Sequence, residues 1–294
     1  MRLAVLTSPD NWYLHDLQRA AASRYEVTPL AFRQLASKLS NSSGLQVFSG
    51  TSNLRDFDAL LVRTMPAASL EQVIFRMDVL GRFEAAGGVV MNPARAIEAA
   101  VDKYLASAKL LEAGLRTPRT IACQTLEDAL AGFEELGGDV VIKPLFGSEG
   151  RGMTRVNDEP LALRAFSMLA QLGAVIYLQE FVPHGGFDIR LLVLGEQVLA
   201  MRRRNALDWR TNVSRGATTE PLEPDEQLVA LAHRAARAIG APLAGVDILP
   251  GRDGELYVLE VNAVPGWKAL SRTLDIDVAA RVLDFVASIA KQRA

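Results

Sequence analysis

The sequence has few of the residues that nucleophilic, redox and zinc chemistry require. Its 294 residues include one cysteine, Cys123, so an intrachain disulfide and a cysteine-rich zinc site are excluded. No motif surrounds Cys123, and we interpret it as a small apolar residue. The three histidines, His15, His184 and His233, lie far apart and form no H-x-x-x-H pattern. A Ser-His or Cys-His nucleophile is therefore not indicated.

Charge of one sign and long hydrophobic runs are also lacking. The 32 Lys and Arg residues nearly cancel the 34 Asp and Glu residues, and the net charge of −2 argues against a general nucleic-acid binder. The apolar run within 1–12 is too short for a signal peptide, and no apolar stretch approaches the roughly 18 residues of a membrane span. We therefore expect a cytoplasmic protein with no nucleic-acid and no membrane partner.

The first third of the chain alternates between strand and helix patterns. Hydrophobic residues make up 49% of the sequence, and the length predicts about two domains. A segment at 37–53 is rich in Ser, Asn and Gly and is predicted to be a loop. Strands followed by helices predict a parallel α/β sheet over 1–95. We expect strands at 2–7, 26–30, 59–63 and 88–92, and helices at 14–23 and 70–86.

The character of the chain changes after this region. Residues 94–113 predict one helix, and a second helix is expected at 125–136. From about residue 140, short strands with turn signals predict hairpins with packed helices, an α+β arrangement. Strands are expected at 140–145, 152–156, 175–181, 189–194 and 197–204, and helices at 160–171, 224–239 and 277–291.

Acidic and amide side chains interrupt two apolar runs within 245–266. The turn-rich break between the runs predicts a β-hairpin that carries Asp247, Glu260 and Asn262. If Asp247 lies opposite Val258 or Glu260, all three oxygen-bearing side chains share one face. Such oxygens suit a hard cation such as Mg²⁺ with phosphate ligands. The alternative interpretation is a surface hairpin whose polar face is solvated.

A lysine and a glycine-rich segment form a second motif. Lys143 ends a predicted strand and is followed by 147–152, where glycines would let backbone N–H groups approach phosphate oxygens. The spacing from Gly147 to Gly152 resembles a P-loop, but Met153 stands where the P-loop lysine must be. We therefore predict a hairpin that closes over phosphates, with an ordinary flexible hairpin tip as the alternative.

A third motif is the predicted hairpin 188–204. A two-residue turn would pair Arg190 with Met201 and Asp188 with Arg203. Asp188, Arg190 and Arg203 then share a face and suit the phosphates and ribose of a nucleotide. The neighbouring arginines take the other face and are interpreted as solvated.

Two weaker segments complete the set. The strand that ends at Glu180 offers a carboxylate, and the backbone of Phe181 and Val182 could bond an adenine edge. The polar loop 208–217 could present donors to an anionic group, although an ordinary surface loop explains it equally well.

In this order, these segments resemble the ATP-grasp ligases, and most closely the branch that contains the glutamate ligase RimK. The resemblance implies an ATP-grasp fold behind an N-terminal parallel-sheet domain. It also implies a division into 1–95, a lysine and glycine-loop subdomain at 96–178, and a metal-binding subdomain at 179–294. The residues that carry the resemblance lie at 102–103, 142–152, 179–181, 188–190, 203–204, 209–212, 244–249 and 260–266.

The resemblance also implies a role for each matched position. Lys103 and Lys143 would contact the ATP phosphates, and Asp188 would hold the ribose. The full implied nucleotide-binding set is Lys103, Lys143, Gly147, Ser148, Glu149, Gly150, Arg151, Gly152, Gln179, Glu180, Phe181, Val182, Asp188 and Arg190. Arg203, Arg210 and Asn212 would face the γ-phosphate or acyl phosphate. Asp247, Glu260 and Asn262 would hold two Mg²⁺ ions, or Mn²⁺.

The implied reaction is ATP-dependent joining of a carboxylate to an amine through an acyl phosphate, with release of ADP. An amino acid, glutamate favoured, would be added to a small-molecule or coenzyme carboxylate, because the chain lacks a basic extension for docking a large ribonucleoprotein. Trp267 and Lys268 would border the acceptor pocket. Alternatives are a ligase acting on a protein C-terminus, a dipeptide or D-alanine-type ligase, and an inactive nucleotide-binding regulator. Homodimers and homotetramers are common in the family.

Overall fold

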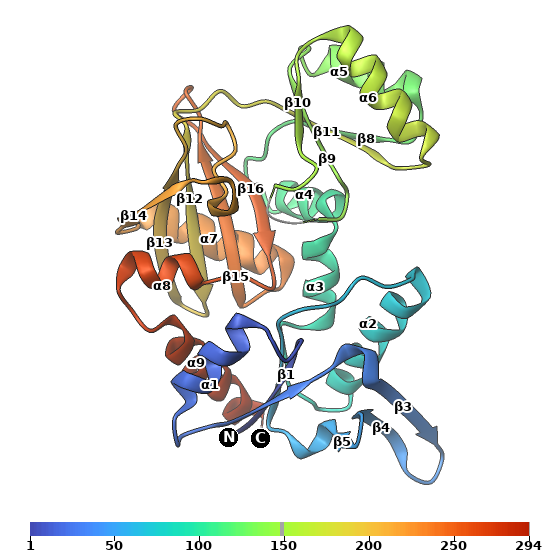
Figure 1. The fold of residues 1–294 in the computed structure, drawn as a ribbon, viewed down its shortest axis with the longest axis vertical. Coiled ribbons are helices and arrows are strands. Elements are labelled where there is room, and N and C mark those ends of the chain that lie inside the picture. The colour runs from blue at the N-terminus through green and yellow to red at the C-terminus, as the bar shows by residue number, and fades with distance from the viewer. Residues whose placement is uncertain (148–149, 294) are drawn as a thin grey trace.

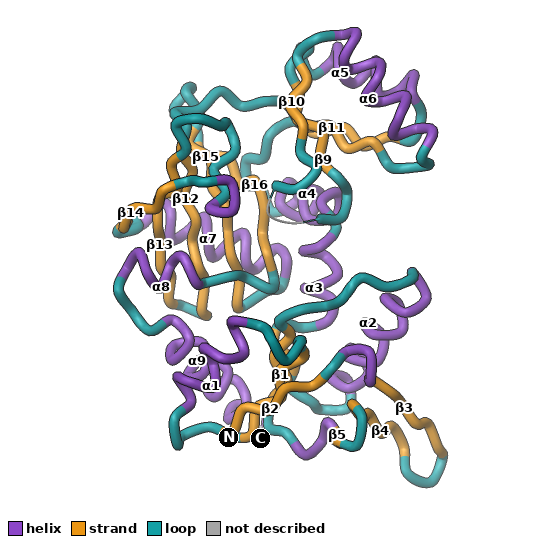
Figure 2. The backbone as a smooth tube through the Cα atoms, in the orientation of Figure 1, coloured by secondary structure: helices purple, strands orange, loops and turns teal. Residues whose placement is uncertain are grey.

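The structure is a computed structural model that describes residues 1–147 and 150–293 (Figures 1 and 2). Its helices are α1 (Trp12–Ala21), α2 (Leu70–Ala85), α3 (Ala94–Val101), α4 (Lys103–Glu112), α5 (Leu126–Glu135), α6 (Glu159–Gln171), α7 (Glu226–Ile239), α8 (Lys268–Leu274) and α9 (Val278–Arg293). Short 3₁₀ helices occur at η1 (Phe32–Gln34), η2 (Leu54–Asp56) and η3 (Val213–Arg215).

The N-terminal sheet is parallel, as predicted. Its strand order is β2 (Glu26–Leu30), β1 (Arg2–Leu6), β6 (Ala59–Val62) and β7 (Val90–Met91). Side chains alternate across β1, so Leu3 and Val5 pack with α1 and α9, whereas Ala4 and Leu6 pack with α2 and α3. Helices on both faces explain why the strand is apolar at every position after the first.

The predicted loop at 37–53 is wrong. The segment forms an antiparallel sheet from β3 (Leu35–Ser40), β4 (Gly44–Ser49) and β5 (Ser52–Asn53), which extends away from the main body (Figure 1). The tight turn ends at Gly44, whose φ of 67° suits glycine. One face of β4 places Leu45 and Val47 against the core, while Gln46 and Phe48 lie on the other face. The prediction of a loop rested on the Ser, Asn and Gly content and did not detect this alternation.

The single helix predicted at 94–113 is also wrong, because the chain breaks at Asp102. This residue is extended, with φ −89° and ψ 105°, and its carboxylate accepts from the backbone N–H of Leu105 at 3.0 Å. Asp102 therefore ends α3 and caps α4. The break places Lys103 at the first turn of α4.

The second sheet is antiparallel and has the order β10 (Thr154–Val156), β9 (Val140–Lys143), β11 (Ile176–Glu180) and β8 (Thr120–Cys123). Helices α5 and α6 pack on it through a separate core that includes Phe133 and Phe166. The pairing of β9 with β10 confirms the predicted glycine-rich hairpin.

The largest sheet is also antiparallel, with the order β14 (Thr218–Leu222), β13 (Gln197–Arg204), β12 (Phe187–Leu194), β15 (Leu243–Pro250) and β16 (Leu256–Asn262). Helix α7 packs against it, and the apolar face of α7 joins the core of the N-terminal region. The predicted α/β and α+β classes are confirmed, whereas the three-part division of the chain stays a prediction. Within the described residues, no helix is long and apolar enough to cross a membrane.

Candidate active site

A cleft of about 990 Å³, counting its open mouth, lies between the second sheet and the largest sheet. The predicted residues that line it are Lys103, Lys143, Gly150, Gln179, Glu180, Phe181, Val182, Asp188, Arg203, Arg210, Asn212, Asp247 and Glu260. The predicted residues that do not line it are Gly147, Arg151, Gly152, Arg190 and Asn262. Ser148 and Glu149 lie outside the described residues.

The β15–β16 hairpin has the register that the metal hypothesis requires. Asp247 pairs directly with Glu260, and Gly245 pairs with Asn262. The three oxygen-bearing side chains therefore project from one face, although a bulge follows Asp247. Asn262 is turned toward the following loop, where its Oδ1 accepts from the backbone N–H of Val264 at 2.8 Å.

Two arginines surround the Asp247 carboxylate. Its oxygens lie 2.7 Å from Arg190 Nη1 and 3.1 Å from Arg203 Nη2. Burial alone would raise the pKa of Asp247, but the two guanidinium groups hold that pKa below its usual range. Arg203 also makes two hydrogen bonds to Asp188, at 2.8 and 2.6 Å. The predicted common face of Asp188, Arg190 and Arg203 is therefore confirmed, and it forms an ion-pair network.

Glu260 differs from Asp247 in its partners. No described residue hydrogen-bonds to its carboxylate, and the positive charges that act on it are those of Lys103, Lys143 and Arg190. Burial, followed by the charge of Asp247, raises the pKa of Glu260. Among the described residues, no group of three or more His, Cys, Asp or Glu side chains is arranged to hold a metal ion by itself. Asp247 and Glu260 are the cleft residues that could hold a hard cation, because their carboxylate oxygens are hard ligands.

Two lysines line the cleft, Lys103 and Lys143. The Lys143 ammonium donates to Gln179 Oε1, and burial lowers the pKa of Lys143 to about 8. Lys103 donates from Nζ to the carbonyl oxygen of Gly147 at 2.9 Å. Burial also lowers the pKa of Lys103. Lys103 and Lys143 therefore bring two ammonium groups to the lining of the cleft, where positive charge suits phosphate.

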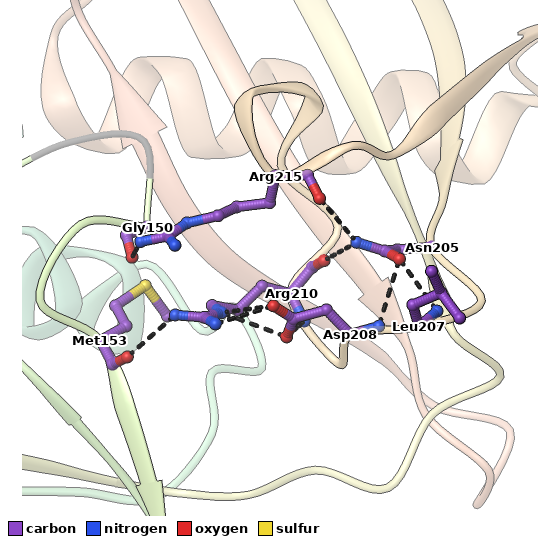
Figure 3. A network of polar contacts seen from close by, with 7 residues as sticks. All are labelled: Gly150, Met153, Asn205, Leu207, Asp208, Arg210 and Arg215. Atoms are coloured by element: carbon purple, nitrogen blue, oxygen red, sulfur yellow. Dashed lines mark hydrogen bonds and ion pairs between the residues drawn. The ribbon is translucent and has the colours of Figure 1, made fainter.

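The glycine-rich hairpin is held against the loop that follows β13 (Figure 3). Arg210 donates to the carbonyl oxygen of Met153 at 3.3 Å, and Arg215 donates to that of Gly150 at 3.3 Å. Gly150 has φ 68°, and a Cβ there would collide with Asn212 Oδ1. The two loops thus meet across the mouth of the cleft, and glycine is required at the contact.

Asn205 orders this second loop and was not anticipated from the sequence. Its amide donates to the carbonyl oxygens of Arg210 at 2.9 Å and Arg215 at 3.3 Å (Figure 3). Its Oδ1 accepts from the backbone N–H of Leu207 at 3.0 Å. Arg210 is further fixed by an ion pair with Asp208 at 2.7 Å. The only sequence signal for this role was an asparagine placed between a strand end and a polar loop.

The segment predicted to hold adenine is partly engaged within the protein. The Glu180 carboxylate lies 2.7 Å from Arg119 Nε, and the Phe181 N–H donates to the carbonyl oxygen of Asp139 at 2.9 Å. The Phe181 ring lies 3.4 Å below the guanidinium carbon of Arg155. The sequence interpretation missed both arginines. It also missed part of the lining of the cleft, which is contributed by Ser107, Val141, Met153, Tyr177, His184, Leu249 and Leu259.

Comparison with known proteins identifies relatives over nearly the whole chain. Residues 100–286 match the RimK-like ATP-grasp domain. The sequence is 32% identical over 320 residues to a tetrahydromethanopterin:alpha-L-glutamate ligase from Methanosarcina acetivorans, covering 97% of this chain and 98% of the relative. A probable alpha-L-glutamate ligase from Picosynechococcus is 30% identical, with 97% of this chain and 95% of the relative covered.

Solved structures show the same architecture. A RimK domain ATP-grasp protein from Sphaerobacter thermophilus is 26% identical with a TM-score of 0.73, covering 97% of this chain and 99% of that chain. The ATP-grasp ligase PsnB, complexed with a minimal precursor, is 24% identical with a TM-score of 0.76, covering 97% of this chain and 98% of that chain. At 24% identity, the PsnB structure shows a shared fold and nothing more. Together the two structures confirm the predicted ATP-grasp fold.

Proposed function

This chain belongs to the RimK-like ATP-grasp ligases, and from that premise we propose that it adds glutamate to a carboxylate of a small-molecule or coenzyme acceptor. It is an ATP-dependent, ADP-forming ligase. The proposal concerns the two substrates, the acyl-phosphate route and the role of each residue.

One arrangement carries the proposal. The paired Asp247 and Glu260 lie on one wall of the cleft, and Lys103 and Lys143 bring positive charge to the same region. Carboxylates that hold Mg²⁺ and ammonium groups that hold phosphate are the parts that phosphoryl transfer needs. A regulator that only binds nucleotide would have no need of both sets.

We assign the residues of the cleft to the steps of an acyl-phosphate reaction. A carboxylate oxygen of the acceptor would bond to the γ-phosphorus as the bond to ADP breaks. The uncharged glutamate amine would then bond to the acyl carbon and lose a proton, and inorganic phosphate would leave. Arg203 and Arg210, with Asn212, would neutralise the transferred group, while Lys103 and Lys143 would orient the phosphates. Mg²⁺, held by Asp247 and Glu260 with Asn262 nearby, would supply charge neutralisation; two ions, or Mn²⁺, are proposed.

Adenine would lie near Glu180 and Val182, against the rings of Phe181 and Trp209. These two rings meet edge to face at 6.0 Å. The Glu180 carboxylate is already paired, so its backbone, rather than its charge, would face the base. The glycine-rich hairpin, held by Arg210 and Arg215, would keep water from the acyl phosphate.

A small coenzyme acceptor is favoured over a peptide. The tetrahydromethanopterin ligase from Methanosarcina acetivorans matches at 32% identity along both chains. The peptide-bound PsnB structure supports only the shared fold at its 24% identity. Assembly as a homodimer or homotetramer, common in the family, stays a prediction.

The test is a screen for ADP release. The protein is mixed with ATP, Mg²⁺ and L-glutamate, and tetrahydromethanopterin or a peptide with a C-terminal glutamate is added as the acceptor. The proposal expects ADP release only when nucleotide, metal, amino acid and small acceptor are all present. Mass spectrometry then identifies the amide product. Equal turnover with the peptide, or turnover with D-alanine alone, would replace the proposal by one of the alternative ligases.

A further inference from the structure

Arg63 is a buried cation that lies outside the cleft already described. It follows β6, is 5% exposed, and its Nε and Nη1 atoms are sealed from solvent without a hydrogen-bond partner among the described residues. The guanidinium carbon lies 4.5 Å from the Tyr13 ring centre and 4.4 Å from the Trp267 ring centre. The charge is therefore sandwiched between two aromatic faces.

Among the residues that the structure describes, no carboxylate pairs with this charge. Burial lowers the pKa of Arg63 to about 10, opposed only by Tyr13, and the guanidinium stays protonated at neutral pH. The Asp16 carboxylate accepts from Trp267 Nε1 at 2.9 Å and pairs with Arg19. Proteins pair buried charges, so an unpaired buried arginine is costly unless a ligand supplies the anion.

The position of Arg63 in the sheet points to a ligand as well. The strand order β2-β1-β6-β7 means that the chain leaves β1 toward one side and returns to the other. Ligands of parallel sheets bind outside the carboxyl ends of the strands at such a reversal. Arg63 and Thr64 lie there after β6, and Thr7 and Asn11 lie there after β1. Asn11 Nδ2 donates to the Thr64 hydroxyl at 3.0 Å, so polar groups gather at this edge.

A short connection joins this site to β16, the strand that carries Glu260. Residues 261–267 lead from Glu260 directly to Trp267, which caps Arg63. A Cβ at Gly266 would collide with the Tyr13 hydroxyl, so the chain passes closely over this site. Trp267 is itself fully buried, so its ring encloses the Arg63 guanidinium and presents no exposed surface.

We propose that Arg63, held between Tyr13 and Trp267, binds through Nη2 a substrate carboxylate other than the one that ATP activates; Nη2 is the guanidinium nitrogen that is not among its two sealed atoms. The activated carboxylate must face Lys143 and Glu260, and Arg63 does not line that cleft. A second carboxylate bound at Arg63 would orient the substrate that carries it, so that its reacting group faces the cleft. The choice between glutamate and the acceptor as the substrate that carries this carboxylate rests on the proposed function.

Binding without nucleotide gives a test that does not depend on turnover. Thermal-shift titrations of the ATP-free protein use L-glutamate and glutarate as probes, with Arg63→Met and Arg63→Lys as variants. Arg76→Met is the matched control, because Arg76 is an equally buried arginine of the same region whose Nη1 has a partner, the Pro66 carbonyl oxygen at 2.8 Å. We expect both Arg63 variants to lose at least about tenfold in probe affinity, whereas Arg76→Met keeps it.

The proposal is overturned if neither probe stabilises the unaltered protein, or if the Arg63 variants bind both probes as Arg76→Met does. Arg63→Lys retains the charge and a long side chain, so it separates the loss of the planar fork from misfolding. A failed ligase assay would leave this binding result standing, which keeps the two proposals distinguishable.

Steady-state kinetics then identify which substrate carries the carboxylate that binds Arg63. In the active ligase, Arg63→Lys should raise one KM by about tenfold and leave the KM for ATP and kcat within about twofold. A rise in the KM for glutamate, with loss of discrimination against isoglutamine or glutamine, assigns its α- or side-chain carboxylate. A rise in the KM for the acceptor assigns the acceptor. A change in kcat alone would indicate a structural role and count against the proposal.

Discussion

The fold lowers the pKa of Lys143 into a range where the effect of its charge on ATP binding can be tested by changing the pH. Its pKa of about 8 results first from burial, and the nearby Lys103 lowers it further. A triphosphate binds the protonated ammonium, so ATP affinity is greatest below the pKa and decreases as pH rises through it. We predict that the Kd for ATP increases about tenfold between pH 7 and pH 9, as the protonated fraction falls. Calorimetry at the two pH values measures this change.

Substitutions at the same position provide the controls. Lys143→Arg should bind ATP with little dependence on pH in this range, because a guanidinium remains charged. Lys143→Ala should weaken binding at least tenfold at pH 7, about 1.4 kcal/mol. Unchanged affinity of the alanine variant would remove Lys143 from the phosphate site.

Glu260 is the second residue whose role can be isolated. Glu260→Gln preserves the size of the side chain but removes a charge that would hold Mg²⁺. We predict that Mg²⁺-dependent ADP release falls by at least about a hundredfold, because metal chemistry supplies several kcal/mol to the transition state. Glu255→Gln is the control, since Glu255 is an exposed acid on the same hairpin. A Glu260→Gln enzyme with normal turnover would refute the metal assignment.

At the scale of elements, the glycine-rich hairpin and the loop after β13 meet at Gly150. Both Gly150 and Gly44 have positive φ, at 68° and 67°, so alanine is strained at either position. Only at Gly150 would the new Cβ also collide with Asn212, whereas Gly44 faces open space. We therefore predict a loss in thermal stability for both alanine variants, larger for Gly150→Ala, and an activity loss of about tenfold or more for Gly150→Ala alone.

The ratio of amide product to released phosphate makes this prediction sharper. If the contact keeps water from the acyl phosphate, Gly150→Ala should release more phosphate per amide formed, while Gly44→Ala keeps the ratio of the unaltered protein. Equal ratios for all three proteins would mean that the contact between the loops has no part in excluding water.

Local hairpins were the elements that the sequence specified best. The two-residue turn between β12 and β13 determined the pairing of Asp188 with Arg203, and the observed register is the predicted one. For Asp247 the sequence left Val258 and Glu260 open as partners, and the observed partner is Glu260. Periodicity failed where a capping side chain decides the outcome: Asp102 fits a helical pattern, yet its extended backbone divides the helix.

Contacts between distant segments could not be derived from the sequence. Periodicity predicts which face of an element is buried but not which element covers it. The ion pair of Arg119 with Glu180 joins residues 61 positions apart, and the Trp267 indole reaches Asp16 across 251 positions. The sequence predicted Arg63 only as the last residue of the strand 59–63. Its burial between two rings depends on three segments meeting, and the whole fold is needed to see it.

At the scale of the whole molecule, Asn92 joins the parallel sheet to the largest sheet. It is 1% exposed, and its amide donates to the carbonyl oxygens of Leu243 at 2.6 Å and Ala263 at 2.5 Å. Its Oδ1 accepts from the Leu243 N–H at 3.0 Å. Asn92→Ala leaves these backbone groups buried without partners, so we predict a loss of about 3 kcal/mol in the free energy of unfolding. Denaturant titration measures the loss, and Asn41→Ala, in an exposed turn, should change it by less than about 0.5 kcal/mol. Equal stability of the two variants would show that the sheets are held together by apolar packing alone.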